Sequence, residues 1–198
     1  MSFTSCASVR TGCASHNVST YAGPPFVVMN NAIPPELLAR VDADEWHIPA
    51  PAPRVVIPNS VVFELLDDTV RQFEWGFPLK FALNTFLVRR RPGPLSGLPP
   101  HRDGENDPYR RRWVSLVGYC TDQASCQGGD LVITATGDHL RPARGDVALI
   151  RGDTVHSVEP ITSGERLTLN VFLAEPRRPH YESPGRTIAR DLDREAPG

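Results

Sequence analysis

Residues 166–173 read Arg-Leu-Thr-Leu-Asn-Val-Phe-Leu, with an apolar side chain at every second position. Residues two apart in an extended strand project from the same face. One face of this stretch therefore carries the leucines and Val171. The other face carries Arg166, Thr168, Asn170 and Phe172. This alternation predicts a strand with one side in an apolar core and the other side toward a cavity.

Similar short apolar runs begin at Phe81 and are separated by glycine and proline turns. This pattern favours a β-sandwich or jelly roll. The expected strands are residues 81–90, 113–119, 129–134, 139–142, 146–150, 155–160 and 165–173.

The preceding part of the chain is expected to contribute helices. After a short apolar strand at residues 26–29, Pro34-Pro35 predicts a helix start, where a missing N–H costs nothing. Residues 47–58 form a proline-rich loop, and Asn59-Ser60 can cap a second helix that runs toward Trp75. We expect both helices to support the outside of the sheet.

The length of 198 residues is sufficient for one compact domain. We expect a single domain over residues 24–175, with helical support in 24–80 and a β core in 81–175. Residues 1–23 are expected to be poorly ordered, and residues 176–198 to form a solvated tail.

The formal net charge of −2 gives no global field for nucleic acid or membranes. No signal peptide or transmembrane stretch is expected, so we predict a cytoplasmic protein. The cysteines lack the spacing of a zinc site or a disulfide scaffold, and we expect reduced thiols. Cys120 and Cys126 could close a small loop if oxidised.

His101-Arg102-Asp103 provides two metal-binding side chains that share one face of an extended segment. A third ligand must come from a distant strand, and His156 is the natural candidate because it follows a turn and opens an extended stretch. Two neutral imidazoles and one carboxylate leave three positions open, as in non-haem Fe(II) oxygenases, whereas structural zinc closes its shell. The alternative is that these are polar loop residues and a core histidine.

Arg166 carries a planar guanidinium on the predicted inner face, and this fork suits a carboxylate. The alternative is an internal salt bridge with Glu159 or Glu165.

These motifs, in their order along the chain, resemble those of the iron(II)- and 2-oxoglutarate-dependent dioxygenases, in particular the prolyl-hydroxylase-like branch. The resemblance extends from about Phe81 to Leu173. The residues that carry it are Arg90-Arg91-Pro92-Gly93, His101-Arg102-Asp103, Gly128-Gly129-Asp130-Leu131, His156-Ser157-Val158-Glu159-Pro160 and Ser163-Gly164-Glu165-Arg166.

The resemblance implies a mainly β fold, a double-stranded β-helix of the jelly-roll or cupin-like type, with N-terminal helices. It implies Fe(II) as cofactor, 2-oxoglutarate as cosubstrate and molecular oxygen. Iron would be bound by His101, Asp103 and His156. Arg166 would bind the C5 carboxylate of 2-oxoglutarate, together with Tyr119. Arg91 stands where the branch commonly has a tyrosine near the C1 carboxylate, and an arginine could serve the same carboxylate.

The reaction class follows from two positions. Halogenating relatives replace the carboxylate ligand, and Asp103 is intact, so hydroxylation is favoured. Nucleic-acid demethylases usually carry a second arginine at the position of Phe172, so a nucleic-acid partner is not expected.

We expect hydroxylation of an unactivated C–H bond in a small amino-acid-like or natural-product substrate. Residues 94–112 and 47–58 would border the cavity mouth. The alternatives are a prolyl hydroxylase acting on a protein or peptide, and a non-catalytic cupin-like module that binds metal or acts as a sensor. The oligomeric state stays open.

Overall fold

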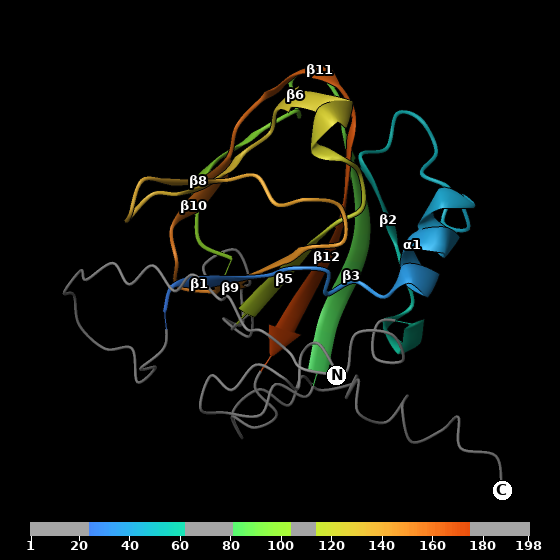
Figure 1. Ribbon diagram of the computed structural model, residues 1–198, viewed down its shortest axis with the longest axis horizontal. Helices are drawn as coiled ribbons and strands as arrows, with labels where there is room; N and C mark the ends of the chain where they lie inside the picture. Colours follow the sequence, from blue (N-terminus) through green and yellow to red (C-terminus); the bar gives the residue numbers. More distant parts are fainter. Residues whose placement is uncertain (1–23, 62–80, 104–113, 175–198) are drawn as a thin grey trace, which may run out of the picture.

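A computed structural model describes residues 24–61, 81–103 and 114–174 (Figure 1). Two antiparallel sheets face each other, and a short two-stranded ribbon closes one end. The larger sheet has the order β1-β9-β5-β12-β3-β2. Its strands are β1 (Phe26–Met29), β9 (Val147–Arg151), β5 (Val114–Tyr119), β12 (Arg166–Ala174), β3 (Phe81–Arg90) and β2 (Arg54–Val56).

The smaller sheet has the order β4-β10-β7-β8, and β11 pairs with β6 in the ribbon. The bounds are β4 (Leu98–His101), β10 (His156–Val158), β7 (Leu131–Ile133), β8 (Asp138–Leu140), β11 (Ile161–Gly164) and β6 (Cys126–Gly128), with a 3₁₀ helix at Gln123–Ser125. The predicted jelly-roll class is confirmed by this mainly antiparallel β architecture.

The outer face of the larger sheet is covered by helix α1 (Pro35–Asp42), which lies beside β2 and β3 in Figure 1. Pro35 occupies the first turn, where the missing N–H leaves no helical bond unmade. Leu37 of α1 is fully buried in one apolar cluster with Leu169 and Val171 of β12. The predicted helix and its support of the sheet are therefore confirmed.

The inner face of β12 points into the space between the two sheets. Thr168 is paired across the ladder with Tyr119 of β5 on one side and with Val88 of β3 on the other. Tyr119 belongs to a second apolar cluster that also contains Ile133 of the smaller sheet. The alternation seen in residues 166–173 thus separates an outer core from an interior lined by both sheets.

Four strands were not predicted. β2 and β4 lie within segments expected to be loops, and β6 and β11 were not assigned. β4 contains Pro99-Pro100, and it is an edge strand, where a residue without an N–H is tolerated because one side of the strand is not paired. β2 is likewise an edge strand.

The expected second helix begins at Asn59, but most of it lies outside the described residues, as do the segments 1–23 and 176–198. No helix within the described ranges is long and apolar enough to span a membrane. Cys120 and Cys126 are both buried free thiols.

Candidate metal centre

The ends of β4 and β10 bring His101, Asp103 and His156 together. His101 and His156 are paired directly across the ladder of the smaller sheet, and their ring centroids are 4.4 Å apart. Asp103 follows β4 by two residues. Each histidine Nε2 atom is 3.5 Å from a carboxylate oxygen of Asp103. One ligand atom from each of the three residues lies within 4.8 Å of the others, so the group can hold a single cation.

Backbone carbonyls fix both imidazole rings. The Nδ1 atom of His101 is 2.8 Å from the carbonyl oxygen of Pro99, and that of His156 is 3.0 Å from the carbonyl oxygen of Thr154. A carbonyl oxygen can only accept a hydrogen bond, so Nδ1 carries the proton. The lone pair of each neutral ring therefore sits on Nε2, the atom that faces Asp103, as metal-binding histidines require.

The electrostatics of the group favour an ionised carboxylate. Burial acts to raise the pKa of Asp103, but the hydrogen bond that a protonated His101 donates, the charge of a protonated His156 and the hydroxyl of Ser115 hold it below its ordinary value. The hydroxyl of Ser115 donates to the Oδ2 atom of Asp103. Burial lowers the pKa of His156, whereas the hydrogen bond to Asp103 raises the pKa of His101. One carboxylate and two imidazoles form a donor set that suits Fe(II).

Arg166 lies inside the barrel at the start of β12, with 7% of its surface exposed. Its Nη1 group donates to the carbonyl oxygen of Gly129, and the guanidinium carbon is 5.9 Å from the centroid of the Tyr119 ring. Burial raises the pKa of Tyr119 to about 12, against the lowering effect of Arg166, so the hydroxyl stays a donor. The Nε atom of Arg166 is buried without a hydrogen-bond partner among the described residues. A buried donor of this kind suits an anionic ligand.

The two acids weighed as partners of Arg166 are engaged elsewhere. Glu165 forms ion pairs with Arg89, at 3.3 Å, and with Arg91. Glu159 lies 3.2 Å from His139. Within the described part of the chain, the guanidinium of Arg166 is therefore bound to a backbone carbonyl and not to a carboxylate.

Arg91 does not join the group. Its side chain is 60% exposed and is paired with Glu165. The neighbouring Arg90 instead stands opposite Arg166 in the β3–β12 ladder, on the inner face. Neither Arg90 nor Ser115 is given a role by the sequence motifs. The position of Ser115 could have been inferred from the sequence. Side chains alternate between the two faces of a strand, which places Ser115 on the same face as Tyr119 in the expected strand 113–119.

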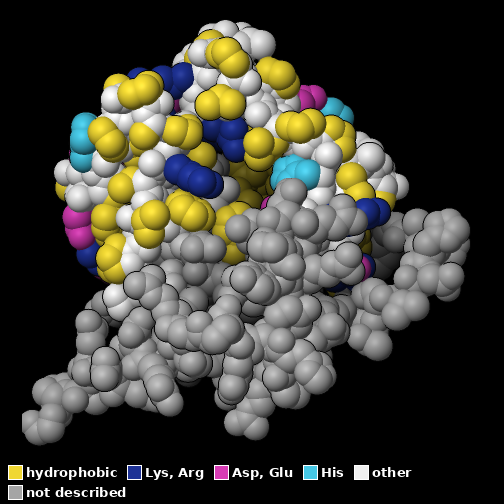
Figure 2. Space-filling view, turned by 180° about the vertical axis from the view of Figure 1, so that it is seen from behind, with side chains coloured by type: hydrophobic (Ala, Val, Ile, Leu, Met, Phe, Trp, Pro, Cys, Tyr) yellow, Lys and Arg dark blue, Asp and Glu magenta, His cyan; other side chains and the backbone are white. Residues whose placement is uncertain are grey.

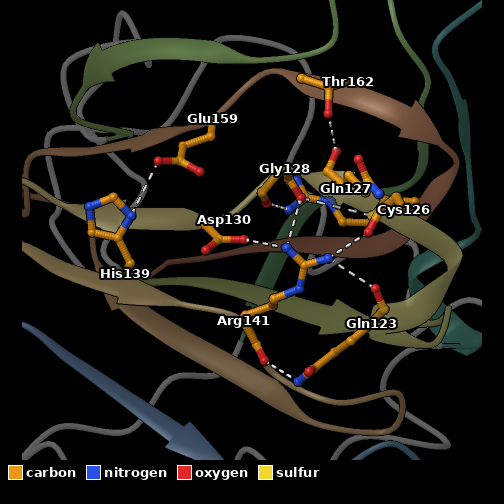
Figure 3. A network of polar contacts seen from close by, with 11 residues as sticks. Gln123, Cys126, Gln127, Gly128, Asp130, His139, Arg141, Glu159 and Thr162 are labelled. Carbon is orange, nitrogen blue, oxygen red and sulfur yellow. Dashed lines mark hydrogen bonds and ion pairs between the residues drawn. The ribbon is translucent and has the colours of Figure 1, made fainter.

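A second group with metal-binding side chains lies on the outside of the smaller sheet (Figure 3). It consists of Asp130, His139 and Glu159, whose ligand atoms lie within 4.8 Å of one another. Arg141 lies 2.9 Å from Asp130 and donates to the carbonyl oxygens of Gln123 and Cys126, at 3.0 and 2.5 Å. The ion pair between Asp130 and Arg141 and the contact between His139 and Glu159 account for this group as a structural network.

The face of the molecule in Figure 2 is hollowed. Arginine side chains lie inside the hollow, and a histidine lies at its edge. A small recess is lined by Tyr119, Gly129, Arg141 and Arg166, among others, so the buried guanidinium of Arg166 borders open space.

Fold and site together define a jelly-roll protein with a two-histidine, one-carboxylate centre. Residues 87–174 match the family model of the 2OG-Fe(II) oxygenase superfamily. This match agrees with the resemblance that the sequence motifs indicated.

Individual relatives agree with this resemblance. A PKHD-type hydroxylase of Sphingopyxis alaskensis is 29% identical over 123 residues, which cover 58% of the chain and 54% of that relative. The chain thus spans about half the length of this curated relative.

Two solved structures share the fold. One is an oxidoreductase of the 2OG-Fe(II) oxygenase family from Burkholderia pseudomallei, with a TM-score of 0.62 and 21% identity, covering 76% of this chain and 84% of that one. The other is a viral collagen prolyl hydroxylase from Paramecium Bursaria Chlorella virus-1 in complex with 2OG. Its TM-score is 0.63 and its identity 14%, with 80% of this chain and 100% of that one covered.

Proposed function

We propose that the protein is an Fe(II)- and 2-oxoglutarate-dependent oxygenase whose iron ligands are His101, Asp103 and His156. The observation that carries this proposal is the orientation of the two imidazoles. Both Nδ1 atoms face backbone carbonyls, and both Nε2 atoms lie 3.5 Å from Asp103. Histidines that bind a metal through Nε2 commonly donate their Nδ1–H to an outer partner such as a backbone carbonyl. Histidines that only form ion pairs with a carboxylate do not need this orientation.

The remaining residues have roles around this centre. Arg166 binds the distal carboxylate of 2-oxoglutarate through its planar fork, with the hydroxyl of Tyr119 as a second donor. Ser115 orients Asp103 through a hydrogen bond to Oδ2. The apolar cluster around Ile133 and Ile150 excludes water from the space between the sheets. Bound iron would supply the oxidative decarboxylation of 2-oxoglutarate and the activation of oxygen.

The reaction we propose is hydroxylation of an unactivated C–H bond in a small amino-acid-like or natural-product substrate. A second candidate is hydroxylation of proline in a protein or peptide. The likeness to a collagen prolyl hydroxylase in fold supports this second candidate. The name of the curated relative, a PKHD-type hydroxylase, supports hydroxylation in either case.

Calorimetric titration with Mn(II), a redox-stable substitute for Fe(II), tests the metal site. The wild type is expected to bind one ion, and His101→Ala and His156→Ala should lose this binding because each removes one of three ligands. His139→Ala is the matched control, since it removes a histidine from the outer group. Unchanged binding in the first two variants, with loss in the control, would move the metal to the outer group.

Titration of the Mn(II)-loaded protein with 2-oxoglutarate tests the anchor. Arg166→Ala should weaken binding by roughly 10- to 100-fold, and Arg166→Lys by less, because lysine keeps the charge without the fork. Equal affinity in all three proteins would remove Arg166 from the site.

Succinate production then separates the candidates. Amino acids and cyclic dipeptides, prolyl peptides and methylated oligonucleotides are compared, with mass spectrometry for the added oxygen atom. Stimulation by prolyl peptides alone would favour the second candidate. Stimulation by oligonucleotides alone would contradict both. Absence of all turnover, coupled or uncoupled, in protein that binds metal and 2-oxoglutarate would indicate a sensing module.

A further inference from the structure

Two arginines lie side by side inside the barrel. Arg90 of β3 and Arg166 of β12 are directly opposed in the antiparallel ladder. Directly opposed residues project from the same face, with Cβ atoms about 5 Å apart. Since Arg166 is buried in the interior, Arg90 is directed toward the same interior.

The described residues provide no carboxylate for this pair of cations. Glu165, the chain neighbour of Arg166, is turned to the other side, where it pairs with Arg89 and Arg91. Asp103 is held by the two histidines and Ser115. Burial, and then the charge of Arg166, lower the pKa of Arg90 to about 10. Two neighbouring cations in a partly desolvated interior favour the binding of anions there.

Arg90 is more exposed to solvent than Arg166. It is only half-buried, and its Nη1 group donates to the carbonyl oxygen of Leu95 at 2.9 Å. Leu95 is 68% exposed and lies in the segment that leads to the metal-binding end of β4.

The charges of the loaded site favour the binding of a second anion. A divalent metal and two arginines carry more positive charge than Asp103 and the two carboxylates of 2-oxoglutarate can balance. One of those carboxylates is assigned to Arg166. A further anion that enters from solvent would reach Arg90 before Arg166.

We propose that Arg90 binds a carboxylate of the primary substrate, so that the enzyme acts on acids in preference to their uncharged amides. This inference rests on the proposed function and narrows its substrate class. Arg90 is thereby a specificity-determining residue, distinct from the cosubstrate anchor Arg166.

The test uses ligand-observed NMR on protein loaded with Zn(II), a diamagnetic substitute, and 2-oxoglutarate. The probes are small carboxylic acids, among them N-acetyl amino acids, each paired with its carboxamide. The wild type should bind at least one acid roughly tenfold or more tightly than its amide, as expected for a charge-assisted hydrogen bond. Arg90→Gln should lose this preference, and Arg90→Lys should keep part of it.

Arg89→Gln is the matched control, because it removes the same charge from the adjacent residue on the opposite face. It should retain the preference of the wild type. Thermal unfolding of each variant measures the stability lost with the Leu95 contact. If Arg90 had only a structural role, Arg90→Gln would lower the unfolding temperature without changing the preference for acid over amide.

Three results would overturn the inference. They are a wild type without acid preference, an Arg90→Gln variant that keeps it, and an Arg90→Gln variant whose affinity for 2-oxoglutarate falls tenfold or more. The last result would assign Arg90 to the cosubstrate. Failure of the wild type to bind Mn(II) or 2-oxoglutarate would instead contradict the proposed function, and calorimetry detects it separately.

Discussion

At the scale of single residues, the site depends on groups that orient the metal-binding side chains. Ser115 donates to Asp103, and two backbone carbonyls fix the rings of His101 and His156. Such contacts hold a ligand in its binding geometry before the metal arrives.

Replacing Ser115 by alanine should lower the affinity for Mn(II) about 10- to 100-fold, because Asp103 loses a hydrogen bond to its ionised form. Ser115→Thr, which keeps the hydroxyl, should bind nearly as well as the wild type. Titration calorimetry of the three proteins measures the difference. Equal affinity in Ser115→Ala would show that the strand alone positions Asp103.

Metal affinity should rise with pH. The metal binds neutral imidazole, and the hydrogen bond to Asp103 raises the pKa of His101 above its ordinary value. A proton therefore competes with the metal at His101 until the pH exceeds this raised pKa. Burial lowers the pKa of His156, so a proton competes less with the metal at that ring. Mn(II) titrations from about pH 6 to about pH 8 should show a steady gain in affinity. A flat profile would contradict the assignment of His101 as a ligand.

The grouping of His101, Asp103 and His156 and the inward position of Arg166 could be predicted from the sequence, because their motifs are short and ordered. The inward position of Arg90, in place of Arg91, could not be predicted. It depends on the register between β3 and β12. A shift of one residue reverses every side chain in a strand, and the sequence near residues 89–91 is arginine throughout.

At the scale of elements, glycines allow the turn before β7 to approach the anchor. Gly129 has a φ of +78°, and a Cβ atom there would lie 3.3 Å from Nη1 of Arg166. Gly137 has a similar φ of +71°, but a Cβ atom would meet nothing within 4 Å. The two positions share the backbone strain and differ in the contact.

Gly129→Ala should therefore weaken 2-oxoglutarate binding beyond any effect of Gly137→Ala, because its methyl group displaces the guanidinium. Both should lose about 1 kcal/mol of folding stability from the left-handed backbone. Calorimetry and chemical unfolding measure the two effects separately. Equal cosubstrate affinity in both variants would mean that Arg166 tolerates the displacement.

Elements with strong periodicity were predicted well, as α1, β1, β3 and β12 show. The edge strands β2 and β4 were missed because prolines dominate their sequences. Their strand conformation comes from pairing with neighbours distant in the chain, which local sequence does not report.

At the scale of the whole molecule, alternating strands and glycine turns predicted a β-sandwich or jelly roll, and the structure confirms a jelly roll. The sheet order could not be read in the same way, because β12 pairs with β3 and β5 across long sequence separations. The distribution of charge inside the barrel also cannot be read from the amino-acid composition. A net charge of −2 gives no hint that two arginines meet inside the barrel.

The pairing of His101 with His156 across β4 and β10 has a mechanical consequence. A metal bound by both would act as a cross-link between an edge strand and the body of the barrel. Metal at about 100 times its dissociation constant should stabilise the folded protein by about 2.7 kcal/mol, and a chelator should remove this gain.

Hydrogen exchange can locate the effect. Amides of β4 and β10 should exchange faster after chelation, while those of the β12–β5 ladder on the opposite sheet should change less. Uniform acceleration in both sheets would show that the metal stabilises the whole fold and does not lock one edge. With localised acceleration, iron loss would loosen the strand that ends at the metal, and the apoprotein would be open to proteases at this edge before it unfolds elsewhere.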